Sequence, residues 1–255
     1  GKPKSLADVG EKQYYGPDET GPPGAPEMET GSSIVSAVDV HRQFETVDGT
    51  LYVLKGISLD VRRSEMAAVT GASGVGKSTL LHILGGLDRP SRGEVMIDGQ
   101  SLSGKSEQWL ARFRNRKVGF VFQHHYLLDD FSALENVMIP MLVTGARRES
   151  SVPRAEQLLA QMGLADRRYH RPKQLSGGEQ QRVAVARALA NDPEIVLADE
   201  PSGNLDTDTG RTLHDLLFRL NRDDGVTFLI ATHNRELAAG CRRQLEIVDG
   251  MIQER

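Results

Sequence analysis

The sequence predicts an α/β fold built around a sheet of short, buried, parallel strands. Three apolar runs carry this prediction, and polar residues follow each of them: residues 66–70 (MAAVT), 195–198 (IVLA) and 226–232 (VTFLIAT). Apolar runs of this length, alternating with helical patterns, are typical of strands that helices cover on both faces. Ligands of such sheets bind beyond the carboxyl ends of the strands, so we expect functional residues directly after these runs.

Composition narrows the classes of protein to which this chain can belong. It has 255 residues and a net charge of −4, without a lysine-rich block or basic stripe that would indicate a nucleic-acid partner. The single cysteine, Cys241, suits a reducing compartment and is expected to be half-buried. The apolar runs are far shorter than the roughly 18 residues of a membrane span, and no signal-peptide pattern opens the chain. We therefore expect a soluble cytoplasmic protein.

Residues 1–33 differ in composition from the rest of the chain. They contain five prolines, six glycines, and six acidic residues against three lysines. Such a segment buries too little apolar surface to fold, so we expect a disordered tail in residues 1–33 and one ordered domain in residues 34–255. A docking role for the tail is the alternative interpretation.

The ordered part is expected to begin with an antiparallel β subdomain. Residues 34–44 (IVSAVDVHRQF) and 51–61 (LYVLKGISLDV) alternate apolar and polar side chains, and the VDGT sequence between them is typical of a hairpin turn. Tyr52 lies on the second strand, 25 residues before Lys77. An aromatic ring there can stack on a nucleotide base, although a tyrosine on a strand is more often ordinary packing.

A phosphate-binding loop is predicted between the first buried strand and the helix that follows it. Residues 71–79 (GASGVGKST) match the pattern G-x-x-x-x-G-K-[ST] in a strand-to-helix context. Glycines let backbone N–H groups converge on an anion, the lysine reaches the terminal phosphates, and the serine offers a hydroxyl to Mg²⁺. A glycine-rich turn that matches by chance is the alternative. The nucleotide-binding residues expected in this loop are Gly71, Ser73, Gly74, Gly76, Lys77, Ser78 and Thr79.

A further buried strand and a helical subdomain are expected in the middle of the chain. Residues 117–122 (KVGFVF) predict a strand that ends at Gln123, whose amide can contact both Mg²⁺ and the attacking water. A surface glutamine without a function is the alternative. Residues 124–177 are predicted to form an inserted helical subdomain with helices in 124–148 and 151–164, in which Ser132 and Glu135 make a capping box. His124 and His125 lack a further ligand at metal-binding spacing, so we interpret them as structural or partner-facing.

Residues 174–190 (QLSGGEQQRVAVARALA) predict a second helix whose N-terminus can bind an anion. Gly177 and Gly178 open this helix with bare backbone amides, and Ser176 adds a hydroxyl. A serine N-cap followed by flexible glycine explains the start of the helix, but it does not explain two consecutive glycines.

Acidic residues follow the buried strand at 195–198. Asp199 and Glu200 emerge at its carboxyl end, where two acids cost too much to serve packing alone. Asp199 can hold Mg²⁺ through water, and Glu200 can orient and deprotonate the attacking water. His233 ends the strand at 226–232 and can donate to a γ-phosphate, although a lone histidine is often just half-buried. Residues 243–254 are expected to close the chain as a hairpin around Asp249 and Gly250.

Together these motifs resemble the nucleotide-binding subunits of ATP-binding-cassette (ABC) transporters. The resemblance rests on GASGVGKST, Gln123, LSGGE, LADEP, GNLD and His233 in this order, and it covers residues 34–255. It implies a P-loop NTPase (RecA-like) core that carries the antiparallel β subdomain and the inserted helical subdomain. The chain departs from the wider family pattern at Glu179, where Gln is common, and at Gly203 and Asn204, where Ser-Ala is common.

The resemblance also implies partners and roles. In this family two cassettes face each other, so Ser176, Gly177, Gly178 and Glu179 of one chain are expected to cover ATP held by Lys77 of a second copy. Tyr52 would stack on the adenine; Ser78, Gln123 and Asp199 would serve Mg²⁺; and Glu200, His233 and Gln123 would form the catalytic set.

Within the family, the stretches at 122–145, 170–189 and 197–206 are most similar to ATPases of bacterial lipoprotein-releasing complexes. This similarity implies a peripheral protein on the cytoplasmic face of the inner membrane. It would bind two integral membrane subunits, with only indirect contact to the lipoprotein cargo and no nucleic acid. The apolar positions Phe131, Leu134, Val137, Met138 and Met141 would then be either internal packing or a socket for those subunits.

Three rival interpretations remain open from the sequence. The chain could serve a related efflux complex of the macrolide type or a cell-division complex. A soluble cassette ATPase acting on DNA or ribosomes is disfavoured, because the chain has no long heptad insertion, second cassette or basic patch. A binding module without hydrolysis is disfavoured because Lys77, Asp199, Glu200 and His233 are all present.

Overall fold

A six-stranded sheet forms the centre of the described chain, which comprises residues 33–47 and 49–254 of a computed structural model. Its strand order is β10-β9-β3-β8-β7-β6. Strands from β9 to β6 are parallel to their neighbours, and β10 is antiparallel to β9. The sheet of short parallel strands is therefore confirmed. The bounds are β3 (Met66–Thr70), β6 (Val118–Phe122), β7 (Ile195–Asp199), β8 (Phe228–Ala231), β9 (Arg243–Val248) and β10 (Met251–Glu254).

The predicted tail in residues 1–33 lies, apart from Ser33, outside the described residues. The expected β subdomain is a four-stranded antiparallel sheet with the order β2-β1-β4-β5. Its hairpin pairs Thr46 with Gly49, as the turn signal predicts. Its strands are β1 (Ser33–Thr46), β2 (Gly49–Arg62), β4 (Arg92–Ile97) and β5 (Gln100–Ser101). The backbone N–H of Lys55 on β2 donates to Gly250 in the β9–β10 turn at 2.8 Å, so the two sheets meet there.

Helices surround the parallel sheet, and most of them begin at a side-chain cap. Ser106, Asp206 and Asn234 each accept a hydrogen bond from a backbone N–H in the first turn of α2, α6 and α7, respectively. The bounds are α1 (Lys77–Leu84), α2 (Glu107–Lys117), α5 (Gly177–Ala188), α6 (Thr207–Asp224) and α7 (Arg235–Gly240). Within the described part of the chain, the helices lack the combined length and apolar character of a membrane span.

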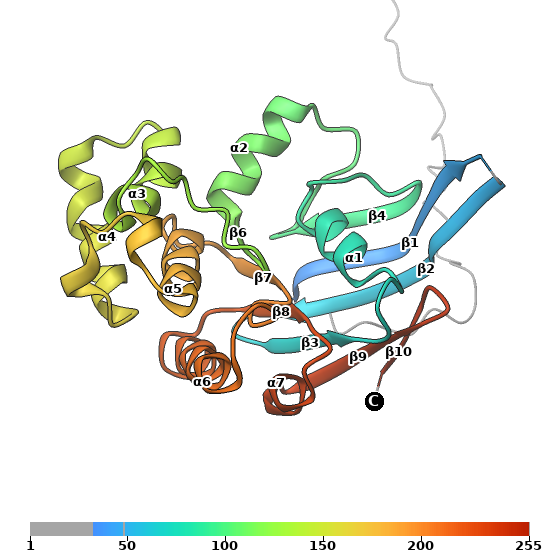
Figure 1. Ribbon diagram of the computed structural model, residues 1–255. Helices are drawn as coiled ribbons and strands as arrows, with labels where there is room; N and C mark the ends of the chain where they lie inside the picture. The colour runs from blue at the N-terminus through green and yellow to red at the C-terminus, as the bar shows by residue number, and fades with distance from the viewer. Residues whose placement is uncertain (1–32, 48, 255) are drawn as a thin grey trace, which may run out of the picture. The chain divides into compact units, whose positions relative to one another are not determined.

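The inserted helical segment contains α3 (Ala133–Val143), α4 (Arg148–Gln161) and the short helices η1 (Ala165–Arg167) and η2 (Pro172–Gln174). In Figure 1, α3, α4 and α5 lie together at the opposite end of the molecule from the β1–β2 hairpin. The capping box of Ser132 and Glu135 is confirmed, with Ser132 Oγ accepting from Glu135 N at 3.3 Å. The helix expected from residue 124 is wrong up to this cap. Residues 124–131 form a loop that Asn136 holds, because its amide bonds both backbone groups of Leu128.

The apolar stripe on α3 is mostly internal packing. Leu134, Val137, Met138 and Met141 are buried in the cluster that α3 shares with α4 and α5, whereas Phe131 is 42% exposed. Of the two interpretations that the sequence leaves open, internal packing therefore holds for these four residues, and Phe131 is the outward-facing member. Cys241 is also more deeply buried than expected, and burial raises the pKa of its thiol to about 12.

Candidate nucleotide-binding and catalytic site

The loop after β3 has the geometry of an anion cradle. Gly71, Gly74 and Gly76 have φ angles of 136°, 78° and 112°, in the region that favours glycine. A Cβ on Gly71 would lie 2.6 Å from the carbonyl oxygen of Ile247, so a side chain cannot fit there. Gly76 caps α1 without a side-chain hydrogen bond, and the first turn of α1 carries no acidic residue. The positive end of the α1 dipole therefore lies at this loop without a side-chain partner at its cap.

Lys77 is folded over this loop. Its Nζ donates to the carbonyl oxygens of Gly71 and Ala72, both at 3.0 Å, and its residue surface is only 8% exposed. In residues 33–47 and 49–254 no carboxylate forms an ion pair with it. Because its partners are neutral carbonyl oxygens, the side chain of Lys77 is available to an anionic ligand. Ser78 follows at the exposed start of α1, as the motif requires.

Parallel register brings the polar strand ends to one edge. Phe122 on β6 pairs with Asp199 on β7, Asp199 pairs with Ala231 on β8, and Val69 on β3 also pairs with Ala231. The residues just beyond these pairs are Gln123, Glu200, His233 and the phosphate loop. The structure therefore brings these predicted residues to a common edge of the sheet.

Asp199 carries the clearest sign of a cation site. Its Oδ1 is buried and has no hydrogen-bond partner within the described chain. An orphaned carboxylate oxygen is costly unless water or a cation satisfies it. Together with the hydroxyl of Ser78 and the amide of Gln123, it provides the oxygen ligands that Mg²⁺ prefers, so the donor set fits this ion.

Glu200 is bound to the residues that follow β8. Its Oε1 accepts from His233 N at 3.0 Å and lies 2.8 Å from His233 Nδ1, while Oε2 accepts from Thr232 Oγ1 at 3.2 Å. A carboxylate oxygen only accepts, so His233 Nδ1 is the donor and Nε2 stays available. The Glu200 backbone has a φ of 46°, an unusual conformation for a residue with a side chain and one that clusters at functional sites.

Tyr52 precedes the part of β2 that contacts the phosphate loop. A Cβ on Gly76 would lie 3.0 Å from Cγ1 of Val53, so the neighbour of Tyr52 in β2 contacts the start of α1. The ring of Tyr52 is available to a flat ligand, because the residue is 57% exposed. The base-stacking role of Tyr52 stays a prediction.

Ser176 and Glu179 form a capping box at the start of α5. Glu179 N donates to Ser176 Oγ at 3.2 Å, and Ser176 N donates to Glu179 Oε2 at 2.8 Å. The hydrogen bond from the Ser176 backbone lowers the pKa of the Glu179 carboxyl. A Cβ on Gly178 would lie 2.2 Å from Cγ2 of Thr209, so packing against α6 accounts for this glycine. Gly177 has ordinary space around it, which leaves its small size unexplained by packing.

The structure gives three residues of this region a role that the sequence does not predict. Gln181, buried on α5, donates to the carbonyl oxygen of Phe122 at 2.8 Å. Arg187, in the last turn of the same helix, donates to the carbonyl oxygens of His125 and Tyr126, both at 2.7 Å. Asn204 bonds Gln123. Polar residues on an otherwise apolar helix, and a polar residue four places after Glu200, are the signals that could have revealed them.

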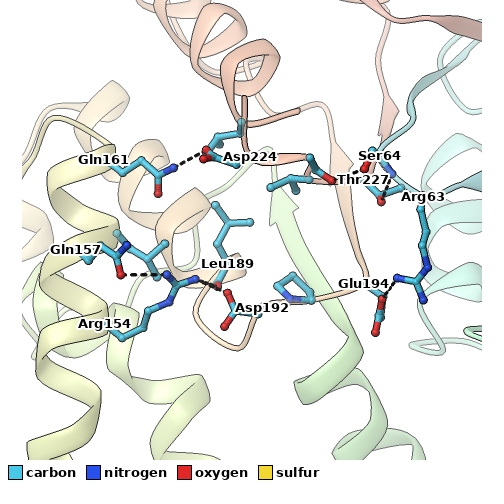
Figure 2. Close-up of a pocket in the computed structure, with 15 residues that line it drawn as sticks. Arg63, Ser64, Arg154, Gln157, Gln161, Leu189, Asp192, Glu194, Asp224 and Thr227 are labelled. Carbon is cyan, nitrogen blue, oxygen red and sulfur yellow. Dashed lines mark hydrogen bonds and ion pairs between the residues drawn. The ribbon is translucent and has the colours of Figure 1, made fainter. Parts of the chain in front are cut away.

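A cavity of about 410 Å³ lies at the other edge of the sheet, where the strands begin. Figure 2 shows Arg63 directed at Glu194 and Arg154 at Asp192, so a carboxylate neutralises each cation. Ser64 and Thr227 also bond each other there, at 3.0 Å. This cavity has neither a free cation nor a convergent set of amides, so it is not the phosphate site.

The chain belongs to the ABC transporter family, because the sequence model of that family matches residues 54–203. It is an ABC ATP-binding subunit with an ATPase domain. The parallel core, the phosphate loop and the acidic strand end described above are the features of an ATP-hydrolysing cassette.

Named relatives narrow this class. The chain is 51% identical over 219 residues to the lipoprotein-releasing system ATP-binding protein LolD of Porphyromonas gingivalis, covering 86% of this chain and 98% of the relative. It is 52% identical to LolD of Syntrophus aciditrophicus over 200 residues, 78% of this chain and 90% of that one. A solved dimer of the cassette MJ0796, in a post-hydrolysis state with ADP and Pi, is 38% identical with a TM-score of 0.80; the match covers 87% of this chain and 97% of that one.

Proposed function

We propose that this chain is the ATPase that drives release of lipoproteins from the bacterial inner membrane. The observation that carries this proposal is the sequence identity to LolD proteins, 51% and 52%, over 98% and 90% of their length. The lipoprotein cargo is proposed to contact the membrane subunits, and this chain only indirectly.

ATP is proposed to bind along the edge that the parallel register creates. Tyr52 stacks on the base, the amides of the loop at 71–79 hold the phosphates, and Lys77 neutralises their charge. Ser78, Gln123 and Asp199 hold Mg²⁺, which supplies charge neutralisation to the phosphate oxygens. The unpaired Oδ1 of Asp199 and the lysine without a carboxylate support this assignment.

Hydrolysis is proposed to use Glu200 as the general base. Its carboxylate accepts the proton of the attacking water, and Gln123 orients that water. The hydrogen bonds from His233 and Thr232 hold the carboxylate in place before water arrives. His233 is proposed to contact the terminal phosphate through Nε2, which donates when both ring nitrogens carry a proton.

A second copy of this chain is proposed to complete the site. Ser176, Gly177, Gly178 and Glu179 of one copy cover the ATP bound by the other. The dimeric form of MJ0796 supports this arrangement. The exposed amide of Gly177 supports it as well, because packing within one chain gives no reason for a glycine there.

Two integral membrane subunits are proposed to dock on a groove of about 350 Å³ beside the loop at 123–126. Its apolar lining includes Leu87, Phe120, Phe122 and Pro140, and the rings of Phe120 and Phe122 stack at 5.6 Å. Arg187 lines the same groove and holds the loop after Gln123, so the groove and the catalytic edge share this loop. The protein then lies peripherally on the cytoplasmic face of the inner membrane.

The test is complementation in a strain depleted of its own lipoprotein-releasing ATPase. The chain is expressed together with the membrane subunits of a lipoprotein-releasing complex, and lipoproteins are followed by membrane fractionation. Wild-type protein should restore lipoproteins to the outer membrane, and Glu200→Gln should leave them in the inner membrane. If wild-type protein leaves sorting unchanged but restores drug efflux or division, the cargo assignment is wrong while the ATPase assignment stands.

A further inference from the structure

Gln123 and Asn204 are joined by two hydrogen bonds that run in opposite directions. Gln123 Nε2 donates to Asn204 Oδ1 at 2.8 Å, and Asn204 Nδ2 donates to the backbone carbonyl oxygen of Gln123 at 3.1 Å. Asn204 Nδ2 also lies 3.1 Å from His124 Nδ1. The loop after β7 therefore holds both the main chain and the side chain of the loop after β6.

The chemistry of the contact fixes the orientation of both amides. A backbone carbonyl oxygen only accepts, so the atom of Asn204 that faces it must be the nitrogen. Oδ1 of Asn204 is then the atom that faces the Gln123 side chain, and it too only accepts. The atom of Gln123 in this bond must be Nε2, which leaves Oε1 as the unbound end of the amide.

Neighbouring residues also restrict the position of the Gln123 amide and of the main chain that carries it. A Cβ on Gly203 would lie 3.0 Å from Gln123 Nε2 and 3.1 Å from its Cδ, so the backbone of residue 203 packs against the amide. On the other side, Gln181 holds the carbonyl oxygen of Phe122. The main chain that carries Gln123 is therefore fixed from α5, and its side chain is fixed from residues 203 and 204.

We propose that Asn204 is a positioning residue that orients the amide of Gln123, so that its oxygen and not its nitrogen is offered to the metal ion of the bound nucleotide. Mg²⁺ takes oxygen ligands, so the reversed amide would present it with a donor. This inference rests on the metal role of Gln123 in the proposed function. It also accounts for the sequence Gly203-Asn204, which the nucleotide-binding motifs do not explain.

The test measures metal affinity without turnover. Mn²⁺ replaces Mg²⁺, a non-hydrolysable ATP analogue fills the site of the full-length protein, and electron paramagnetic resonance reports free and bound Mn²⁺. Asn204→Ala should weaken Mn²⁺ binding roughly fivefold, the equivalent of one lost hydrogen bond. Gln161→Leu is the matched control, because it removes a 2.6 Å side-chain bond to Asp224 far from this edge. Wild-type Mn²⁺ affinity in Asn204→Ala would overturn the proposal.

A double-mutant cycle separates this inference from the function on which it rests. Gln123→Ala should weaken Mn²⁺ binding by itself, and adding Asn204→Ala should then have no further effect, because Asn204 acts through Gln123. Additive effects would overturn the positioning role alone. If Gln123→Ala binds Mn²⁺ like wild type, the metal role of Gln123 is wrong and the inference falls with it, while the ATPase tests of Lys77 and Glu200 are unaffected.

Discussion

Glu200 and His233 form a two-point contact, in which the backbone N–H of His233 donates to Glu200 Oε1 at 3.0 Å and its ring Nδ1 donates to the same oxygen at 2.8 Å. The carboxylate is thereby held before substrate binds, and the side chain of Glu200 is only 15% exposed. A held carboxylate at a strand end is suited to receiving a proton from water in one defined direction.

Glu200→Gln should therefore abolish turnover and keep ATP binding. Removing a general base is expected to slow hydrolysis by roughly a hundredfold or more. Phosphate release measures turnover, and fluorescence of a labelled ATP analogue measures affinity. Glu236→Gln is the control, because that exposed glutamate forms its ion pair with Arg211 and not with His233. With ATP and Mg²⁺ the Glu200→Gln protein should sediment as a dimer; a monomer under these conditions would contradict the shared site.

Lys77→Ala should reduce ATP affinity by roughly 10- to 100-fold, the range expected for loss of a hydrogen bond to a charged group. Because the ammonium also bonds two carbonyl oxygens of the loop, a modest decrease in melting temperature should accompany the loss. Lys105→Ala removes an exposed lysine over Trp109 and should leave ATP affinity unchanged. Near-wild-type binding in Lys77→Ala would place the nucleotide elsewhere.

A charge cluster should make stability depend on acid pH. Lys117 Nζ bonds Asp98 at 2.9 Å and Glu194 at 2.8 Å, and its hydrogen bonds lower the pKa of both carboxyls. Carboxyls with lowered folded pKa values stabilise the protein above their unfolded pKa, about 4, and lose that contribution as the pH falls through the folded values. Lys117→Met should cost about 1 kcal/mol at pH 7 by urea unfolding, and less at pH 3. An equal loss at both pH values would contradict this account.

The contact between α5 and α6 should depend on Gly178. A new Cβ there would overlap Thr209 Cγ2 at 2.2 Å, so Gly178→Ala should destabilise the fold by about 1–3 kcal/mol. Gly177→Ala should not, because its Cβ would meet only Leu205 at 3.7 Å. Thr209→Ser removes the obstructing methyl and should restore the melting temperature of Gly178→Ala. Failure of this rescue would show that overlap is not the cause.

Assembly with the membrane subunits should depend on the groove beside β6. Leu87 lines this groove and is 45% exposed, so Leu87→Asp should leave the isolated subunit folded and prevent co-purification with the membrane subunits. Val38→Asp is the matched control, because Val38 is 42% exposed on β1. Equal recovery of both variants with the membrane subunits would contradict the docking surface.

The sequence predicts the fold and the strand-end residues because these depend on local patterns. Buried strands are apolar throughout, and the phosphate loop is a continuous motif, so Lys77, Asp199 and Glu200 are recognisable without the fold. Asn204, Gln181 and Arg187 are not, since their partners lie 59 to 81 residues away in the chain. The sequence leaves two interpretations of the apolar face of α3 open for a related reason: periodicity shows that Met138 and Val137 avoid water, but not whether the chain itself or a partner covers them.

The register that aligns Phe122, Asp199 and Ala231 also restricts how the length of this chain can change. Side chains alternate across a strand, so one residue inserted into β7 would turn Asp199 to the other face and move Glu200 out of reach of His233. Residues 144–147 are exposed and join α3 to α4 by a turn, so a tag or additional residues can be accommodated there. Length variation among proteins of this kind should accordingly concentrate in such turns and spare the strands that end at the nucleotide edge.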